Sequence, residues 1–259
     1  MAREHQPKTP AWPPKSAPRL FVERQLSDGL HLNIEGNQAH YLSRVMRVGI
    51  GDPVVLCDNM SGEWAAKVTD VTKHDVSLQL TEILRPKEDV PDFWLCPALL
   101  KKDRFDLVLE KATELGVARI QPVIMRRCVA DKLNLDRARK IMTEAAEQCA
   151  RTALPEIANP VKLDALRKKW PSDRAMYFAD EDGGEPATTA FANHPWPAAL
   201  LIGPEGGFDD AERNSILEMK ESHPISLGPR ILRGETAAIA GTALWMGTMG
   251  DWKTENHGK

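Results

Sequence analysis

Hydrophobic residues follow two different patterns along this chain, and the change comes at about residue 85. Between residues 19 and 84, short apolar segments separated by turn residues predict strands. The expected strands are 20–22, 30–34, 53–56, 64–71 and 76–80. One helix, at about 37–47, interrupts them, and Leu42, Val45 and Met46 are expected on its inward face. Short strands around a single helix predict a small β-barrel.

Beyond residue 92 the pattern becomes an alternation of apolar runs and amphipathic helices. The expected strands are 93–99, 119–124, 174–179, 198–202 and 224–227, and the expected helices are 103–116, 136–151, 209–221 and 235–250. On the helix at 136–151, Cys149 is expected to share the buried stripe with Ala138 and Met142. This alternation predicts an α/β fold with a mostly parallel sheet that helices cover on both faces.

The same patterns divide the chain into parts. Residues 1–18 are rich in proline and charge and are expected to be a flexible extension. Residues 19–84 form the expected first domain, and the charged, proline-broken segment 85–92 is the expected linker. The expected second domain covers residues 93–252.

Two glycine–proline loops follow the last two expected strands. The first is GPEGG at 203–207, and the helix after it is expected to be capped by Asp209 or Asp210, with Glu212 placed for a capping-box contact. The second opens the stretch LGPRILRGETAA at 227–238. Ligands of α/β proteins bind at the carboxyl ends of the strands, so two such loops predict one ligand held by backbone from both sides. Neither loop is a P-loop or a dinucleotide fingerprint, and each alone is equally consistent with a tight structural turn.

Composition indicates the class of protein but not its ligand. In 259 residues, 42% are hydrophobic and 27% charged, which is typical of a soluble globular protein. A net charge of −3 neither favours nor excludes a nucleic-acid partner. The four widely spaced cysteines and seven histidines show no metal-ligand spacing, so no metal site is expected. With no apolar run of membrane-spanning length and no apolar core near the amino terminus, we expect a cytoplasmic protein without membrane contact.

Charged residues near the loops and helix starts are the candidates for chemistry. Glu205 and Glu235 could accept ligand hydroxyls or act as bases, or they could simply stabilise helix starts. Positive charge is concentrated in three places: Arg44 with Arg47 on one face of the expected first helix, Lys101 with Arg104 at the start of the helix at 103–116, and Arg126 after the strand at 119–124. These residues could contact phosphates, although solvated surface is the commoner fate. His40 and Tyr41 could stack on a base, but such a pair more often packs its helix.

Five stretches carry a resemblance that covers nearly everything after the extension. They are HYLSRVMRVGIGD (40–52), KKDRFDLVLEKATELGVARIQPV (101–123), EAAEQCARTALPEI (144–157), LLIGPEGGFDDAE (200–212) and ISLGPRILRGETAA (225–238). Together they closely resemble the bacterial 16S ribosomal RNA uridine-N3 methyltransferases of the SPOUT superfamily. Gly234 stands where that family often has threonine, which leaves Thr236 as the nearby hydroxyl.

The resemblance implies a PUA-like RNA-binding barrel followed by an α/β domain with a deep trefoil knot. It also implies a homodimer, S-adenosylmethionine as methyl donor, and N3 of a uridine in 16S rRNA or the assembled small subunit as acceptor. The helix at 235–250, with Trp245, Met246 and Met249 adding apolar surface, suits packing against a second subunit. Other readings are a knotted methyltransferase acting on tRNA, or a non-catalytic RNA-binding dimer.

The implied chemistry gives the candidate residues their roles. Backbone between apolar walls would hold the adenine, at Ile202, Gly203, Gly207, Leu227, Gly228, Ile231 and Leu232. Uridine N3 carries a proton and is a poor nucleophile until that proton is lost. Arg233 is therefore expected to stabilise the N3 anion, and Glu235 is the candidate base or ribose partner. Since N3 lies on the pairing edge, the target uridine must be unpaired and turned into the site.

Overall fold

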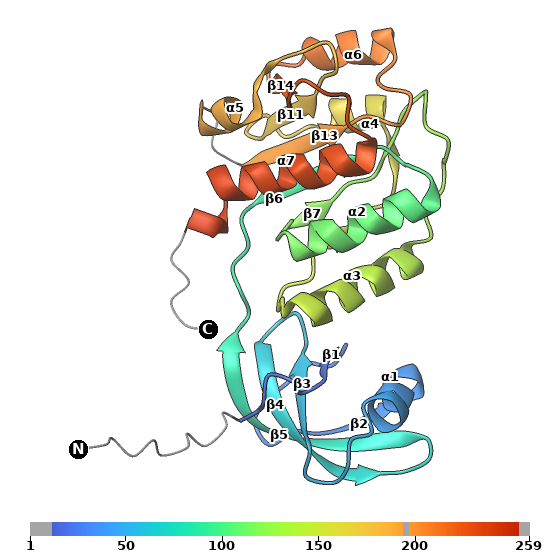
Figure 1. Cartoon of the computed structure of the whole chain (residues 1–259), viewed down its shortest axis with the longest axis vertical. Helices are drawn as coiled ribbons and strands as arrows, with labels where there is room; N and C mark the ends of the chain where they lie inside the picture. The colour runs from blue at the N-terminus through green and yellow to red at the C-terminus, as the bar shows by residue number, and fades with distance from the viewer. Residues whose placement is uncertain (1–11, 194–196, 254–259) are drawn as a thin grey trace, which may run out of the picture. The chain divides into compact units, whose positions relative to one another are not determined.

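A computed structural model describes residues 12–193 and 197–253, and the chain divides into two compact units (Figure 1). The first unit comprises the described residues up to Glu88 together with Ala150–Ala153. The second unit comprises Asp89–Cys149 and the described residues from Leu154 onward.

The first unit is built on a curled five-stranded sheet in the order β1-β3-β4-β5-β2. Its strands are β1 (Arg19–Phe21), β2 (His31–Glu35), β3 (Pro53–Cys57), β4 (Gly62–Val71) and β5 (Asp75–Pro86). All five expected strands are therefore present. Three register shifts between β4 and β5 mark bulges, which bend the long hairpin. The sheet encloses an apolar core that includes Leu56 and Leu78.

The helical segment of the first unit is shorter than expected. It consists of α1 (Gly36–His40) and a π-helical turn, η1 (Tyr41–Val45). Leu42 is fully buried, as predicted, but Val45 and Met46 are 61% and 38% exposed, so their inward placement was wrong. The reason is that the helix ends at Val45, and Arg47 adopts a left-handed backbone conformation with φ 55°. Arg44 and Arg47 are both exposed, but they do not share a helical face.

The second unit contains a seven-stranded sheet in the order β12-β14-β11-β13-β6-β7-β9. Its strands are β6 (Phe93–Pro97), β7 (Arg119–Ile120), β9 (Glu156–Ile157), β11 (Ala175–Ala179), β12 (Glu185–Pro186), β13 (Ala198–Ile202) and β14 (Ser222–Ser226). Every pairing in it is parallel, which confirms the predicted parallel sheet. The expected strand at 119–124 is interrupted by Gln121 and Pro122. Its second half, β8 (Val123–Ile124), pairs instead with β10 (Val161–Lys162).

Helices cover both faces of this sheet, as predicted (Figure 1). They are α2 (Lys102–Glu114), α3 (Leu135–Cys149), α4 (Leu163–Lys168), α5 (Ala187–Asn193), α6 (Asp210–Leu217) and α7 (Gly234–Thr248), followed by the short η2 (Asp251–Lys253). Along β13, Leu200 belongs to the core shared with α2, α3, α5 and α7, while Leu201 belongs to the core shared with α4 and α6. Successive strand residues point to opposite faces, so one strand stabilises both layers.

Two expectations about helix surfaces need correction. Cys149 is exposed, because α3 ends there and Ala150 turns the chain with φ 62°. Trp245 and Met246 add no outer apolar surface, because both are fully buried and the Trp245 ring stacks on Phe93 with centroids 4.2 Å apart. The helix α7 is thus anchored in its own unit by its largest side chains. None of the helices in the described ranges is both long and apolar enough to span a bilayer.

Candidate functional site

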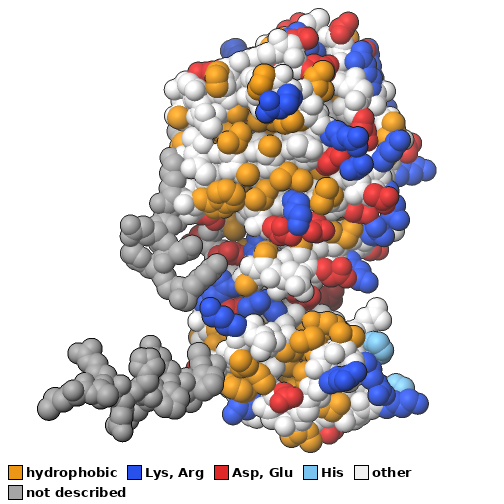
Figure 2. Space-filling view, viewed as in Figure 1, with side chains coloured by type: hydrophobic (Ala, Val, Ile, Leu, Met, Phe, Trp, Pro, Cys, Tyr) orange, Lys and Arg blue, Asp and Glu red, His pale blue; other side chains and the backbone are white. Residues whose placement is uncertain are grey.

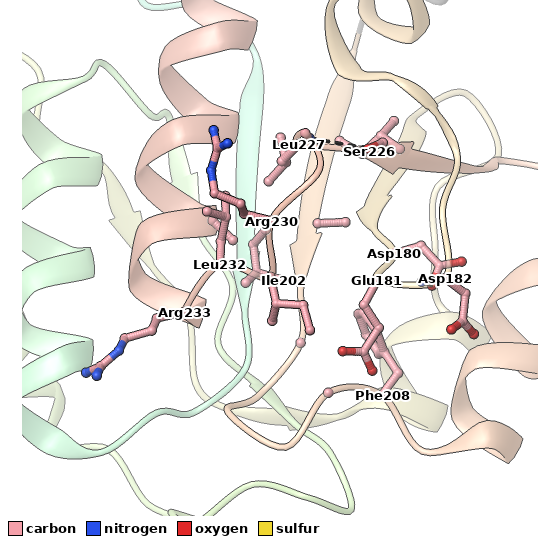
Figure 3. A pocket seen from close by; sticks show the side chains of 18 of the residues that line it. Asp180, Glu181, Asp182, Ile202, Phe208, Ser226, Leu227, Arg230, Leu232 and Arg233 are labelled. Atoms are coloured by element: carbon pink, nitrogen blue, oxygen red, sulfur yellow. Dashed lines mark hydrogen bonds between the residues drawn. The ribbon is translucent and has the colours of Figure 1, made fainter.

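A cavity of about 470 Å³ opens in the second unit where β11, β13 and β14 end (Figure 3). Its walls are the three segments that follow these strands, at 180–183, 203–208 and 227–234, together with Ile202, Ile225 and Ala237. Neighbouring parallel strands deliver their carboxyl ends to one edge of a sheet, so loops distant in sequence meet there. The volume is within the range of small-molecule sites.

All seven residues predicted to hold a cofactor line this cavity: Ile202, Gly203, Gly207, Leu227, Gly228, Ile231 and Leu232. In Figure 3, Leu232 lies on the side of the cavity that carries Arg230 and Arg233, and Ile202 lies between these residues and Asp180, Glu181 and Asp182. Ile231 is 88% exposed, so it adds an apolar side chain that lies open to solvent among the described residues.

Two glycines of the cavity are required by local geometry. Gly228 has φ 115°, a conformation that residues with a Cβ rarely adopt. Gly207 has φ 70°, and a Cβ built there would lie 2.4 Å from Oε1 of Glu181. The two loops thus contain glycines at positions where a side chain would be strained, while close approach of their backbone to a ligand stays a prediction.

Three acidic residues that were not expected from the glycine loops form one wall. Asp180 has a fully buried carboxylate that accepts hydrogen bonds from Nε and Nη2 of Arg213, the latter at 2.8 Å. This bond raises the pKa of Arg213. Asp182 lies 3.3 Å from the same guanidinium. Glu181 is exposed and has no such partner in the described part of the chain. The sequence carried one indication of this wall, the run DEDGG at 180–184 directly after the expected strand 174–179.

Basic residues stand on the opposite side. Figure 3 shows Arg230 and Arg233 across the cavity from Asp180, Glu181 and Asp182. Both arginines are exposed, and neither forms an ion pair within residues 12–193 and 197–253. Arg233 is also the N-cap residue of α7. The cavity thus offers a cationic lip and an anionic wall with apolar surface between them.

Glu235 does not line the cavity, contrary to the expectation of a base or ribose partner there. Its side chain is buried, and Oε1 lies 3.0 Å from Nη1 of Arg104. The carboxylate is therefore engaged inside the protein by a guanidinium and does not face a ligand in the cavity. The same contact occupies Arg104, one of the residues expected to reach phosphates.

The other predicted basic residues of this unit are partly engaged in holding loops. The backbone N–H of Lys101 donates to Oε1 of Glu205 at 3.2 Å, so Glu205 stabilises the start of α2. Arg126 pairs with Asp209 at 2.8 Å, and its backbone N–H donates to Glu212 at 2.9 Å. The expected capping-box contact of Glu212 is therefore replaced by one to Arg126.

Asp209 is the N-cap of α6, as predicted, because its side chain accepts from the N–H of Ala211. On the visible face of the second unit, basic and acidic side chains are interspersed (Figure 2). Among the described residues, no three His, Cys, Asp or Glu side chains gather in a way that could hold a metal ion.

In the first unit, a second cavity of about 380 Å³ lies between the α1–η1 segment and the β4–β5 turn. It is lined by Glu35, Gly36, His40, Ser43, Arg44, Lys73, His74 and Asp75. His40 and Arg44 were both candidates from sequence, whereas Arg47 lies outside this lining.

Comparisons with known proteins agree for both units. Residues 87–246 match the family model described as an RNA methyltransferase domain, and residues 34–81 match the RNA methyltransferase PUA domain. Ribosomal RNA small subunit methyltransferase E of Rickettsia conorii is 30% identical over 231 residues, 87% of this chain and 93% of that protein.

Two solved structures are similar over almost the whole chain. Ribosomal RNA small subunit methyltransferase E of Neisseria gonorrhoeae, bound to S-adenosylmethionine, is 28% identical with a TM-score of 0.83, covering 92% of this chain and 100% of that one. A Legionella pneumophila protein solved with S-adenosylmethionine is 29% identical with a TM-score of 0.80, covering 91% and 99%.

Proposed function

This chain belongs to the RNA methyltransferase family that includes ribosomal RNA small subunit methyltransferase E, and from this premise we propose that it methylates small-subunit ribosomal RNA with S-adenosylmethionine as donor. The observation that carries the proposal is the cavity at the ends of β11, β13 and β14. It brings together all seven residues expected around the cofactor, in a chain whose relative was solved with that cofactor bound.

The residues of the cavity fit the donor. Backbone at 202–203 and 227–232 can form hydrogen bonds to an adenine edge, while Ile202 and Leu232 supply apolar walls for its ring. The donor supplies an activated methyl group whose departure leaves a neutral thioether, so the chain's own task is positioning.

We propose N3 of an unpaired uridine as the acceptor, following the resemblance described from sequence. Arg233 stands free at the lip and can place its guanidinium near the uracil oxygens. This charge would favour loss of the N3 proton to water, after which the nitrogen lone pair bonds to the methyl carbon and the carbon–sulfur bond breaks. Glu235 is paired with Arg104, so we assign the N3 proton to water and not to a carboxylate of this chain.

The knot, the PUA-like barrel and the homodimer are further parts of the proposal. For the knot, a Cβ built on Gly234 would lie 3.3 Å from the carbonyl oxygen of Gly203, so the start of α7 lies against the first glycine loop. For the dimer, Leu244 and Trp252 are exposed at and beyond the end of α7, and Ile231 is exposed at the cavity. Hydrophobic side chains also lie along the α7 face in Figure 2. We also propose that the protein works in the cytoplasm, where its ribosomal substrate is made.

The test is methyl transfer from isotopically labelled S-adenosylmethionine to three substrates: assembled small subunits, free 16S rRNA and tRNA. Mass spectrometry of the nucleosides identifies the methylated base. We expect label in 3-methyluridine from a small-subunit substrate. Label only in tRNA would favour the alternative substrate, and no label combined with tight RNA binding would favour a non-catalytic protein.

A further inference from the structure

The acidic wall of the cavity contains one carboxylate that no neighbouring cation balances. Asp180 and Asp182 both pair with Arg213. Glu181, between them in sequence, is exposed and has no hydrogen bond or ion pair to any residue in the described ranges. Its charge is therefore available to a ligand.

The exposed Glu181 side chain lines the cavity. Its Oε1 lies so close to Gly207 that a Cβ there would be 2.4 Å away, so the carboxylate rests against the backbone of the first glycine loop. In Figure 3 it lies beside Phe208, on the side of the cavity away from Leu232 and the two arginines. A ligand that fills the apolar region near Leu232 would extend toward this carboxylate.

We infer that Glu181 binds the α-ammonium group of the methyl donor, an inference that rests on the proposed function. If loop 227–232 holds the adenine, the amino-acid end of the donor must lie elsewhere in the cavity. Arg230 and Arg233 would repel an ammonium group, whereas an unpaired carboxylate accepts charge-assisted hydrogen bonds from it. Glu181 is thus a ligand-positioning residue supplied by a loop outside the two glycine motifs.

Calorimetric titrations with three ligands distinguish binding of the ammonium group from binding of the sulfonium or of the rest of the donor. S-adenosylmethionine carries both the sulfonium and the ammonium charge, S-adenosylhomocysteine only the ammonium, and 5′-methylthioadenosine neither. We expect Glu181→Gln to weaken the first two by a similar factor, on the order of ten- to a hundredfold, and to leave the third unchanged. The matched control is Glu185→Gln, which removes one charge four positions further along the chain, at an exposed carboxylate that does not line the cavity. It should change all three affinities less than threefold.

Each other outcome overturns the inference in a distinct way. Weakening of S-adenosylmethionine alone would put the carboxylate at the sulfonium instead. Equal weakening of all three ligands would mean a disturbed loop, and unchanged affinities would leave Glu181 without a role. If the wild-type chain bound none of the three, the proposed function itself would fall, and the inference with it.

Discussion

Arg233 and Glu235 are two positions apart, but their side chains have opposite environments. Arg233 is exposed at the cavity, whereas Glu235 is 4% exposed and held 3.0 Å from Arg104. An exposed guanidinium at the cavity can stabilise charge that develops on a substrate, whereas the carboxylate of Glu235 is paired with Arg104 and does not line the cavity. The sequence could not separate them, because both stand at the start of one helix and burial depends on residues that are 130 positions away.

The role of Arg233 can be tested by single turnover at saturating RNA. Arg233→Ala should lower the methylation rate on the order of a hundredfold, as for other removed charge-stabilising donors. Arg233→Lys should keep part of the rate, because a charge remains without the planar fork. Cofactor affinity should change little in both, and the wild-type rate should rise with pH until the bound uridine is deprotonated. A wild-type rate in Arg233→Ala would contradict a role in the chemical step and would favour simple contact with an RNA phosphate.

Gly228 tests the second glycine loop. Its φ of 115° is unfavourable for any side chain, and the new atoms of Gly228→Val would stand at the cavity wall. We expect calorimetric affinity for S-adenosylmethionine to fall at least tenfold, with the thermal midpoint lowered only modestly. The control is Gly51→Val in the first unit, where φ is 91° and no atom lies within 4 Å of the new Cβ. That control should show the same strain and an unchanged affinity.

At the scale of elements, most strands and long helices followed from the sequence, because apolar runs and 3.6-residue periods mark them directly. The same patterns placed both glycine loops at strand ends, and these loops line the cavity. The predicted helix at 37–47 extends too far at its C-terminal end. Neither the π-helical turn nor the left-handed conformation of Arg47 changes the pattern of hydrophobic residues, so the sequence does not reveal them. The acids at 180–182 were missed because the loop that carries them lacks a motif, and only the sheet order brings it to β13 and β14.

The acidic loop is tied to α6 through one residue, Arg213, which pairs with both Asp180 and Asp182. The side chain of Asp180 is fully buried and forms an ion pair with Arg213. The substitution Arg213→Ala would therefore leave a buried carboxylate without this cation. We expect a loss of roughly 1–3 kcal/mol in the free energy of unfolding, measured by urea denaturation. The double variant Arg213→Ala with Asp180→Asn should recover part of that loss, because the stranded charge is gone. Equal stability of the single variant and the wild type would contradict the assigned dependence.

In the first unit, acid stability depends on Glu63. Burial would raise the pKa of this carboxyl, but hydrogen bonds from Arg85 and Arg19 outweigh burial and hold the pKa below 4.5. A depressed pKa contributes stability above the unfolded value, and the contribution disappears as pH falls through the folded value. Glu63→Gln should therefore be less stable than wild type at pH 7, by roughly 1–3 kcal/mol, and the difference should shrink below about pH 4.5. A difference that stays constant from pH 7 to 3 would contradict this.

At the scale of the whole molecule, each unit has its own apolar core and its own kind of site. The second unit has the cavity expected to hold the methyl donor, lined almost entirely by loops at strand ends. The first unit has exposed arginines and a small cavity with His40, Arg44, Lys73 and His74, and it matches a PUA domain of RNA methyltransferases. If the first unit binds RNA and the second binds the methyl donor, a substitution on the surface of one unit should leave the affinity of the other unchanged.

This independence gives the last prediction. If Arg44 and Arg47 each contact one phosphate, changing both to Ala should weaken RNA binding and lower the slope of log K against log salt by about 1.4 to 1.8. Cofactor affinity should stay constant, because both residues belong to the first unit. The control double variant, Lys168→Ala with Lys169→Ala, removes the same charge from exposed positions of the second unit and should leave the slope unchanged. Filter binding at several salt concentrations measures both slopes. Equal slopes in wild type and the arginine variant would mean that these side chains are only solvated surface, and the RNA-binding role would pass to other basic residues.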